Sequence, residues 1–353
     1  MFALARPAFV ESYPMGTARG LDTTRRAFAT WAATVLVFSA SASAVRGQAE
    51  FGVLLSPDLG RQPFKVDYRA GGYFDVDVDD QDTEMQMTQH RLGLSLPVMQ
   101  DERREWLIST RFGVMDLHTS TVLPDTREPL PNQLWDLRVG TSYRRKLDSG
   151  WIAGGTFSVG SASNRLFASG AETIVHANGF VRIPSGQRNA WLFLLNYAND
   201  REFLPHVPIP GVGYQVAPNR KFRALLGAPV SSLHVEPIDG LTLDASYFLV
   251  RTVHAEIGYR ILAPLKLYAG FHWDNQRFYL TGREDDDDRL FYYEKRVVGG
   301  IRWDIVENVW LDCSAGWAFD RFFFEAESYR DRDENRIDIS DGPMLQLRLG
   351  VSF

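Results

Sequence analysis

The last eleven residues of the chain constrain its fold more than any other segment. From Pro343 to Phe353, apolar and polar side chains alternate strictly. Successive side chains of a β-strand point to opposite faces, so this pattern predicts a strand with one apolar and one polar surface that ends on an aromatic residue. This is typical of the closing strand of a bacterial outer-membrane β-barrel. The apolar positions are Leu345, Leu347, Leu349, Val351 and Phe353, opposite Gln346, Arg348, Gly350 and Ser352.

The same alternation recurs upstream. It is clear in 253–261, 265–274, 289–305 and 309–320, where charges occupy one face, with Lys295 breaking the outer face of its strand. Segments 64–78, 84–98, 104–118, 133–147, 150–160, 171–184 and 188–199 follow it less cleanly. On the single face that carries the charges we expect the lumen-lining residues, which are Asp244, His254, Glu256, Arg260, His272, Asp274, Glu294, Arg296, Arg302, Asp304, Asp312 and Arg348.

The connections between these segments alternate in length. Links at 305–308, 262–264, 237–240, 185–187, 148–149 and 99–103 are short, whereas 325–341, 281–288, 200–220, 160–170, 118–133 and 79–83 are mostly longer. Short periplasmic turns and longer extracellular loops are typical of bacterial barrels. The sequence therefore predicts an all-β, transmembrane, antiparallel up-and-down β-barrel of about 14 strands, within a range of 12 to 16. Pro229, in the proline-rich stretch 205–236, leaves open one additional short hairpin, which would raise the count to 16.

The N-terminal residues have the order of a secretory signal peptide. Arg25 and Arg26 precede a short apolar run, and Ala42 and Ala44 form a small-residue cleavage pattern. Residues 24–28 also resemble a twin-arginine signal, an alternative export route. We predict a leader and signal peptide at 1–44, a periplasmic tether at 45–63 and the barrel at 64–353, with the protein exported to the bacterial outer membrane.

Composition excludes several classes of protein. The chain has a net charge of −6, which becomes −8 once residues 1–44 are removed, and no basic stripe suits a nucleic acid. The only cysteine, Cys313, excludes disulfides within the chain and a lipid-anchored N-terminus. The aromatic content of 13% suits rings at two membrane interfaces, and we expect 278–279 and 322–324 to lie in the upper girdle.

Local patterns allow two further kinds of site. The four aspartates at 285–288 and the group Asp331, Asp333, Asn335 and Asp338 could hold a calcium ion, although Arg336 stands where the helix-loop-helix calcium motif needs glycine. Solvated loop charge is the simpler interpretation, and no cofactor or metal is predicted. The pairs His118/Ser120 and Ser232/His234 each share one strand face, as outer-membrane lipid hydrolases require, but the third member of a triad is not identifiable.

The second half of the chain resembles an uncharacterised, domain-of-unknown-function family of bacterial outer-membrane β-barrels. The runs that carry the resemblance are GYRILAPLKLYAGFHWDNQRFYL, DDDDRLFYYEKRVVGGIRWD, WAFDRFFFE and NRIDISDGPMLQLRLGVSF. The resemblance implies a barrel in the outer membrane and no activity, so it transfers no catalytic residue.

These observations favour a porin-like passive pore or transport protein for small hydrophilic solutes, and not an enzyme. A closed structural or adhesive barrel is the first alternative, because the predicted lumen charges have both signs and could pair. A barrel-embedded acyl hydrolase using Ser120 or Ser232 is the second. The expected partners are outer-membrane lipids and, during biogenesis, the barrel-assembly machinery; the oligomeric state is open.

Overall fold

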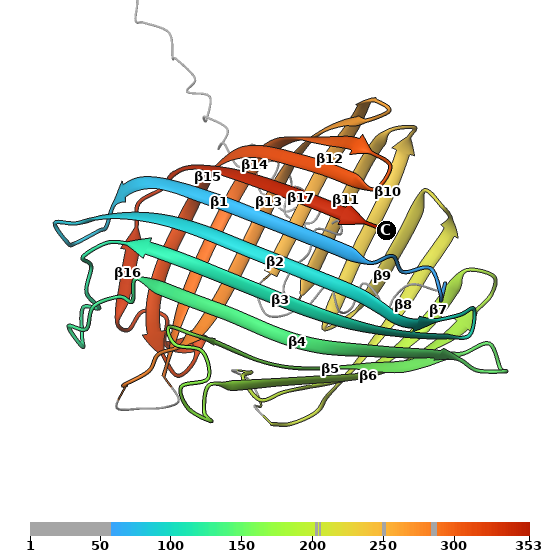
Figure 1. The fold of residues 1–353 in the computed structure, drawn as a ribbon, viewed down its shortest axis with the longest axis horizontal. Helices are drawn as coiled ribbons and strands as arrows, with labels where there is room; N and C mark the ends of the chain where they lie inside the picture. Colours follow the sequence, from blue (N-terminus) through green and yellow to red (C-terminus); the bar gives the residue numbers. More distant parts are fainter. Residues whose placement is uncertain (1–57, 202–203, 205, 249–251, 284–287) are drawn as a thin grey trace, which may run out of the picture. The chain divides into compact units, whose positions relative to one another are not determined.

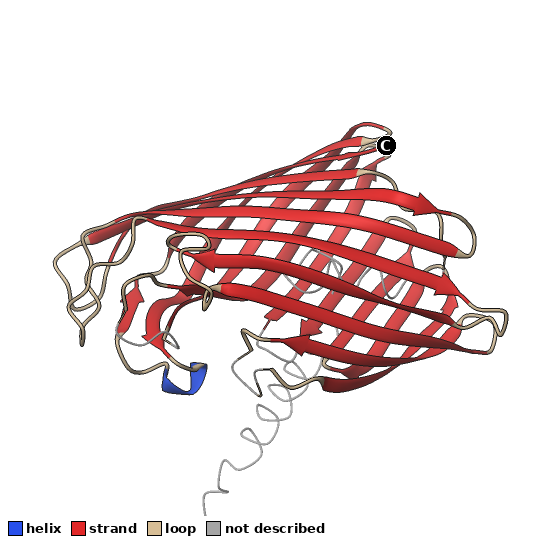
Figure 2. Cartoon of the chain, turned by 60° about the horizontal axis from the view of Figure 1, so that its bottom comes forward, coloured by secondary structure: helices blue, strands red, loops and turns tan. Residues whose placement is uncertain are grey.

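The computed structural model describes residues 58–353 except 202–203, 205, 249–251 and 284–287. The predicted signal peptide and most of the predicted tether lie outside the described residues. Figure 2 shows that the described chain is built of strands, with one short 3₁₀ helix, η1 (Tyr329–Asp331), in the loops. The strands are β1 Lys65–Asp77, β2 Glu84–Gln100, β3 Arg104–His118, β4 Gln133–Lys146, β5 Ile152–Ser163, β6 Thr173–Ser185, β7 Asn189–Ala198, β8 Ile209–Asn219, β9 Phe222–Ala228, β10 Val230–Ile238, β11 Leu241–Phe248, β12 Thr252–Leu262, β13 Leu265–Tyr279, β14 Arg289–Val306, β15 Val309–Ala326, β16 Arg336–Ile339 and β17 Gly342–Ser352.

Sixteen of these strands form one closed antiparallel ring (Figure 1). Each strand pairs with the next along the chain, and the ring closes where β17 pairs with both β15 and β1. The short strand β16 pairs only with β15 and lies outside the ring. The predicted up-and-down β-barrel is confirmed, with a strand count at the upper limit of the predicted range.

The two strands beyond the expected 14 come from the proline-rich stretch. Strands β8 and β9 form a hairpin there, and Pro229 separates β9 from β10. Proline lacks the N–H that a strand interior would use, so it lies between two strands and not within one. The alternative that Pro229 suggested, an additional hairpin that preserves an even strand number, is therefore correct.

Connections alternate between the two ends of the barrel as predicted. One end, here called the turn end, has short links such as 220–221, 239–240 and 307–308. The other, the loop end, has most of the longer links, including 119–132, 164–172 and 327–341. Outward aromatic rings 40–49% exposed lie near the turn end on several strands; they are Trp106, Tyr143, Trp191, Tyr259 and Trp303.

The outer face of the ring is apolar and exposed. In β17, Leu345 and Leu347 are 53% and 42% exposed, while inward Met344 is 2% exposed. Exposed Leu, Ile, Val, Phe, Trp and Tyr side chains alternate with inward residues in the same way on β2–β5, β7, β12 and β14. A band of this kind on every side is the surface that a barrel presents to lipid. Cys313 is exposed on this outer face, opposite Leu347.

One local irregularity changes which side chains face inward. The β14–β15 register shifts between Tyr293 and Lys295, so two residues of β15, Asp320 and Arg321, oppose Glu294. Asp320 has a φ of 50°, as a bulge allows. It therefore faces outward, where its carboxylate lies 2.5 Å from the Lys295 ammonium. The charge that breaks the outer face is thus paired on that face, while Arg321 turns inward.

Strands β13, β14 and β15 continue past the end of β12 at the loop end. The tip of β13 reaches β5, where Tyr279 pairs with Ser163 and the Asn164 N–H donates to the Tyr279 carbonyl over 3.3 Å. Seven strands separate β5 from β13 in either direction around the ring. The β13–β14 hairpin therefore crosses the mouth of the barrel to the opposite wall.

Among the described residues, no helix has the length and apolar content to cross a membrane.

Candidate functional site

The inward face of β10–β17 and β1 holds the predicted lumen residues, and most of them pair with residues of a neighbouring strand. Asp244 pairs with His234, Glu256 with Lys266 at 2.7 Å, and Arg302 with Asp312 at 3.1 Å. Near the turn end Arg260 lies 3.2 Å from Asp304, and Arg348 lies 3.5 Å from Asp67 on β1. Opposite charges therefore pair along the wall and not across the interior, so this pairing does not itself fill the barrel.

The remaining predicted residues form one chain of contacts on β12–β14. His272 Nδ1 lies 2.8 Å from His254 Nδ1, and His254 Nε2 lies 3.1 Å from Asp274 Oδ1. The Arg296 guanidinium donates to Asp274 over 2.8 Å and also pairs with Glu294. Glu294 is fully buried.

Two tyrosines that the sequence reasoning missed complete this chain. Tyr73 and Tyr292 donate their hydroxyls to Glu294 over 2.9 and 3.0 Å. The inward position of Tyr73 was readable from β1, where Asp67, Arg69 and Tyr73 stand at alternate positions. A buried carboxylate is stable only when paired and hydrogen-bonded, and these contacts supply both conditions.

His254, His272 and Asp274 form the one group in the described part of the chain with three metal-ligating side chains. Their ligand atoms lie within 4.8 Å of one another, although the sequence shows no metal-binding spacing. Two imidazoles and a carboxylate are a donor set that suits divalent transition metals. However, Arg296 already pairs with Asp274, and the two histidines contact each other, so a metal would have to displace these contacts.

Above this polar wall, the interior is apolar at the loop end. Inward side chains of β1–β6, such as Met87, Met115 and Leu134, join Leu290 and Phe323 of β14 and β15 in one buried cluster, here called the plug. Phe323 and Tyr292 are fully buried, with ring centroids 4.7 Å apart. The plug thus closes the part of the mouth that lies between β1–β6 and β13–β17.

The aromatic residues near 278 and 322 do not form the expected upper girdle. Phe278, Tyr279 and Phe323 belong to the plug and are at most 8% exposed. Phe322 and Phe324 face outward but are covered by Tyr329 of η1. The prediction was wrong because these strand ends extend past the ring and fold against other parts of the chain.

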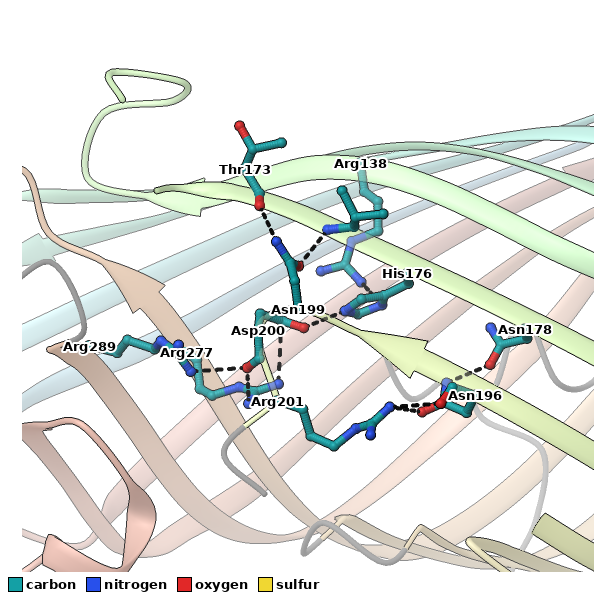
Figure 3. A network of polar contacts seen from close by, with 11 residues as sticks. Arg138, Thr173, His176, Asn178, Asn196, Asn199, Asp200, Arg201, Arg277 and Arg289 are labelled. Atoms are coloured by element: carbon teal, nitrogen blue, oxygen red, sulfur yellow. Dashed lines mark hydrogen bonds and ion pairs between the residues drawn. The ribbon is translucent and has the colours of Figure 1, made fainter. Parts of the chain in front are cut away.

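A buried aspartate in the β7–β8 loop ties the crossing hairpin to the far wall (Figure 3). The Asp200 carboxylate lies 2.6 Å from His176 Nε2 of β6, and Arg138 of β4 lies 2.9 Å from the other ring nitrogen. From the hairpin, Arg277 and Arg289 donate to the Asp200 carbonyl over 2.6 and 3.1 Å. We call this group of five residues the latch.

The latch holds its carboxylate in the ionised form. Burial alone would raise the pKa of Asp200, but the nearby charges of Arg277, His176 and Arg138 outweigh it and hold the pKa well below its usual value. A depressed folded-state pKa contributes stability that is present above the unfolded value, ~3.9, and that is lost only as the pH falls through the lower folded value. The Asp200 carboxylate therefore stays charged throughout the neutral and mildly acidic range.

Replacing Asp200 with asparagine is expected to loosen the β13–β14 hairpin by about 1–3 kcal/mol. The variant keeps the backbone carbonyl that accepts from Arg277 and Arg289, but it removes the buried negative charge that lies 3.4 Å from Arg277. The protection factors of 276–282 in hydrogen–deuterium exchange, which correct for the intrinsic pH dependence of amide exchange, should fall in the variant and stay unchanged between pH 7 and about pH 5 in the parent protein. Asp239→Asn, at an exposed turn-end pair with Lys221, is the control. Equal exchange in both variants would contradict a latching role.

The acidic loop residues are bound to other groups. Asp333 and Asp338 both lie near Arg336, at 3.4 and 2.5 Å, while Asp331 accepts the Ser328 hydroxyl over 2.8 Å. The Asn335 amide donates to Glu325 over 3.2 Å. Two of these carboxylates thus share Arg336, and the other side chains have separate partners, which fits the interpretation as loop charge. Three of the four aspartates at 285–288 lie outside the described residues.

The two Ser/His pairs differ in their surroundings. Ser120 lies in a loop, and its hydroxyl is 2.9 Å from that of Thr83. In the lumen, His234 pairs with Asp244, so a base and an orienting carboxylate are present beside Ser232. Within the described chain, no hydrogen bond joins Ser232 to His234, the contact on which nucleophile activation depends.

At the turn end, the chain before β1 enters the interior. Arg144 of β4 pairs with Glu105 of β3 at 2.6 Å, and both are almost fully buried. The Gly60 N–H donates to Glu105 over 3.1 Å, and the Asp58 carbonyl accepts from Arg144 over 3.3 Å. Leu59 packs against Ile152 and Phe180. The end of the predicted tether therefore binds inside the barrel.

No family model and no curated protein matches the chain, so the family resemblance is supported only as far as the barrel itself. Solved structures with similar folds include an outer membrane channel from Pseudomonas putida F1 (13% identity, 85% of this chain and 98% of that chain, TM-score 0.35). They also include the translocator domain of the autotransporter NalP from Neisseria meningitidis (10% identity, 94% of this chain and 98% of that chain, TM-score 0.33). A third is OprB from Pseudomonas putida (9% identity, 89% of this chain and 99% of that chain, TM-score 0.32). Similarity at this level carries no inference about activity.

Proposed function

We propose that this protein is an outer-membrane β-barrel that passes small hydrophilic solutes, and that the β13–β15 extension restricts passage at the loop end. The exposed apolar band and the aromatic rings near the turn end support a lipid environment. In this orientation the turn end faces the periplasm and the loop end the exterior. The barrel binds lipid through its outer face and carries out no chemistry.

The observation that carries the proposal is the contrast within the interior. A ring of 16 strands is wider than its own side chains fill, and barrels of this size enclose an aqueous channel. The wall below the loop end is charged, and its charges are paired between strands of the wall. The plug, by contrast, is apolar and buried, and hydrophobic constrictions can gate channels by excluding water.

The plug also favours a second candidate, the closed structural or adhesive barrel. Conductance separates the two, because a closed barrel passes no ions whatever the state of the hairpin. A disulfide between Asn164→Cys and Thr281→Cys, in a Cys313→Ser background, would hold the hairpin on β5. The Thr281 backbone N–H donates to the Asn164 side chain over 2.9 Å, so these positions are adjacent.

We expect the oxidised double-cysteine variant to stay at its lowest conductance in planar bilayers and to open when dithiothreitol reduces the disulfide. The single variant Thr281→Cys, treated identically, should not respond. Equal conductance in oxidised and reduced protein would refute the restriction at the hairpin. If neither the parent nor the reduced variant conducts at any salt concentration, the closed barrel is correct.

A further inference from the structure

Three arginines stand side by side on the inward face where the barrel closes. Arg69 of β1 is directly opposite Arg348 of β17 on one side and Arg91 of β2 on the other. Directly paired residues of antiparallel strands project from the same face, so three guanidinium groups share one row. Like charges directly opposite each other destabilise a sheet. The row therefore needs a compensating interaction.

The described residues provide little compensation. Arg348 lies 3.5 Å from one carboxylate, that of Asp67. Its buried Nε has no hydrogen-bond partner among the described residues. Arg91 donates only to the neutral side chain of Gln89, over 3.4 Å. No hydrogen bond or salt bridge joins Arg69 to any described residue. One carboxylate thus faces three guanidinium groups.

The nearby carboxylates are already bound elsewhere. Glu294 accepts from Tyr73, Tyr292 and Arg296, and Asp274 lies against Arg296 and His254. Arg296 itself adds positive charge beside the row. Beside the row lies a small void of about 10 Å³, lined by Arg69, Arg91, Arg296, Gln89, Gln346 and Tyr73. It has room for about one water molecule, so an oxyanion is expected to bind on the inward side of the row and not within this void.

We propose that Arg69, Arg91 and Arg348 form an anion-binding site in the barrel interior. Each guanidinium presents paired N–H donors that match the oxygens of a carboxylate, sulfate or phosphate group. Gln89 and Gln346 add amide donors, and no carboxylate other than Asp67 competes for the row. The ligand class is a small oxyanion or the carboxylate of an organic acid. As a statement about which solutes pass the barrel, this inference rests on the proposed function; as a binding site it does not.

Binding is measured on the full barrel in detergent by isothermal titration with sulfate and with succinate, at constant ionic strength in chloride. We expect Arg69→Gln and Arg91→Gln each to weaken binding at least tenfold, because a charge-assisted contact is lost. Arg145→Gln, an exposed residue at the end of β4, should bind as the parent does. Preference for sulfate assigns the site to inorganic oxyanions, and preference for succinate to organic acids.

Thermal unfolding provides a second readout that a purely structural arginine would not give. Without oxyanion, Arg69→Gln should unfold at the same or a higher temperature than the parent, because the substitution relieves repulsion. Sulfate should stabilise the parent and not the variant. Equal binding of sulfate and of succinate by parent and Arg69→Gln, or binding of neither by the parent, would overturn the site. If the barrel conducts ions but binds no oxyanion, the anion-binding site is refuted and the proposed function stands. If it binds an oxyanion but conducts no ions, the proposed passage is refuted and the site stands.

Discussion

Leu347→Arg is expected to prevent most of the protein from folding into a barrel. Leu347 lies near the middle of β17 on the outer face and is 42% exposed, opposite Ala70 and Cys313 on the neighbouring strands. Arginine on the lipid face near the membrane midplane costs ~2–4 kcal/mol in barrels of this kind. The folded fraction can be measured by the faster gel mobility of unheated protein after refolding into vesicles.

The matched control is an arginine on the inward face. Ser109 of β3 pairs with the neutral residues Ser95 and Gly140 and lies next to outward Ile108. Ser109→Arg should fold nearly as well as the parent, because the new charge faces the interior and not lipid, and no like charge is directly opposite it. If Leu347→Arg folded as well as Ser109→Arg, the assignment of the outer face to lipid would be wrong.

Phe323→Ala should produce the second large effect, on both stability and permeability. The Phe323 ring is fully buried in the plug and packs against Tyr292. Truncating a buried phenylalanine costs ~3–5 kcal/mol and leaves a cavity. Here the cavity lies in the proposed restriction, so single-channel conductance should rise as denaturation resistance falls.

The neighbouring residue separates these two effects. Phe322 is 3% exposed and packs 4.6 Å from Tyr293, but in the outer cluster covered by Tyr329. Phe322→Ala should lose comparable stability without any gain in conductance. A rise in conductance in both variants would mean that general loosening, and not removal of the plug, opens the barrel.

The strand pattern of the barrel was readable from the sequence because it is a local property. A pleated strand exposes alternate side chains whatever it pairs with, so Leu345, Leu347 and Leu349 could be assigned to one face without knowing their neighbours. The lengths of the connections are also a local property, and they showed that short and long links alternate between the two ends of the barrel. The strand count was low by one hairpin because five prolines obscured the pattern between 205 and 236.

The contacts of the interior could be predicted only in part. Alternation placed Asp274, Glu294 and Arg296 on the charged face, but which of them touch depends on the register between strands. The missing partner Tyr73 comes from β1, which reaches this wall only because the ring closes. No local pattern in the sequence encodes that closure.

Tertiary structure alone decided what happens at the loop end. The rings of Phe278, Tyr279 and Phe323 have the same sequence pattern whether they face lipid or a plug. Phe323 points inward because the bulge at Asp320 shifts the residues after it to the opposite face of β15. Phe278 and Tyr279 are buried because β13 crosses the mouth to β5. Asp200 joins both walls for the same reason. Alternation is set by each residue's own backbone, whereas the plug and latch depend on packing between segments far apart in the chain.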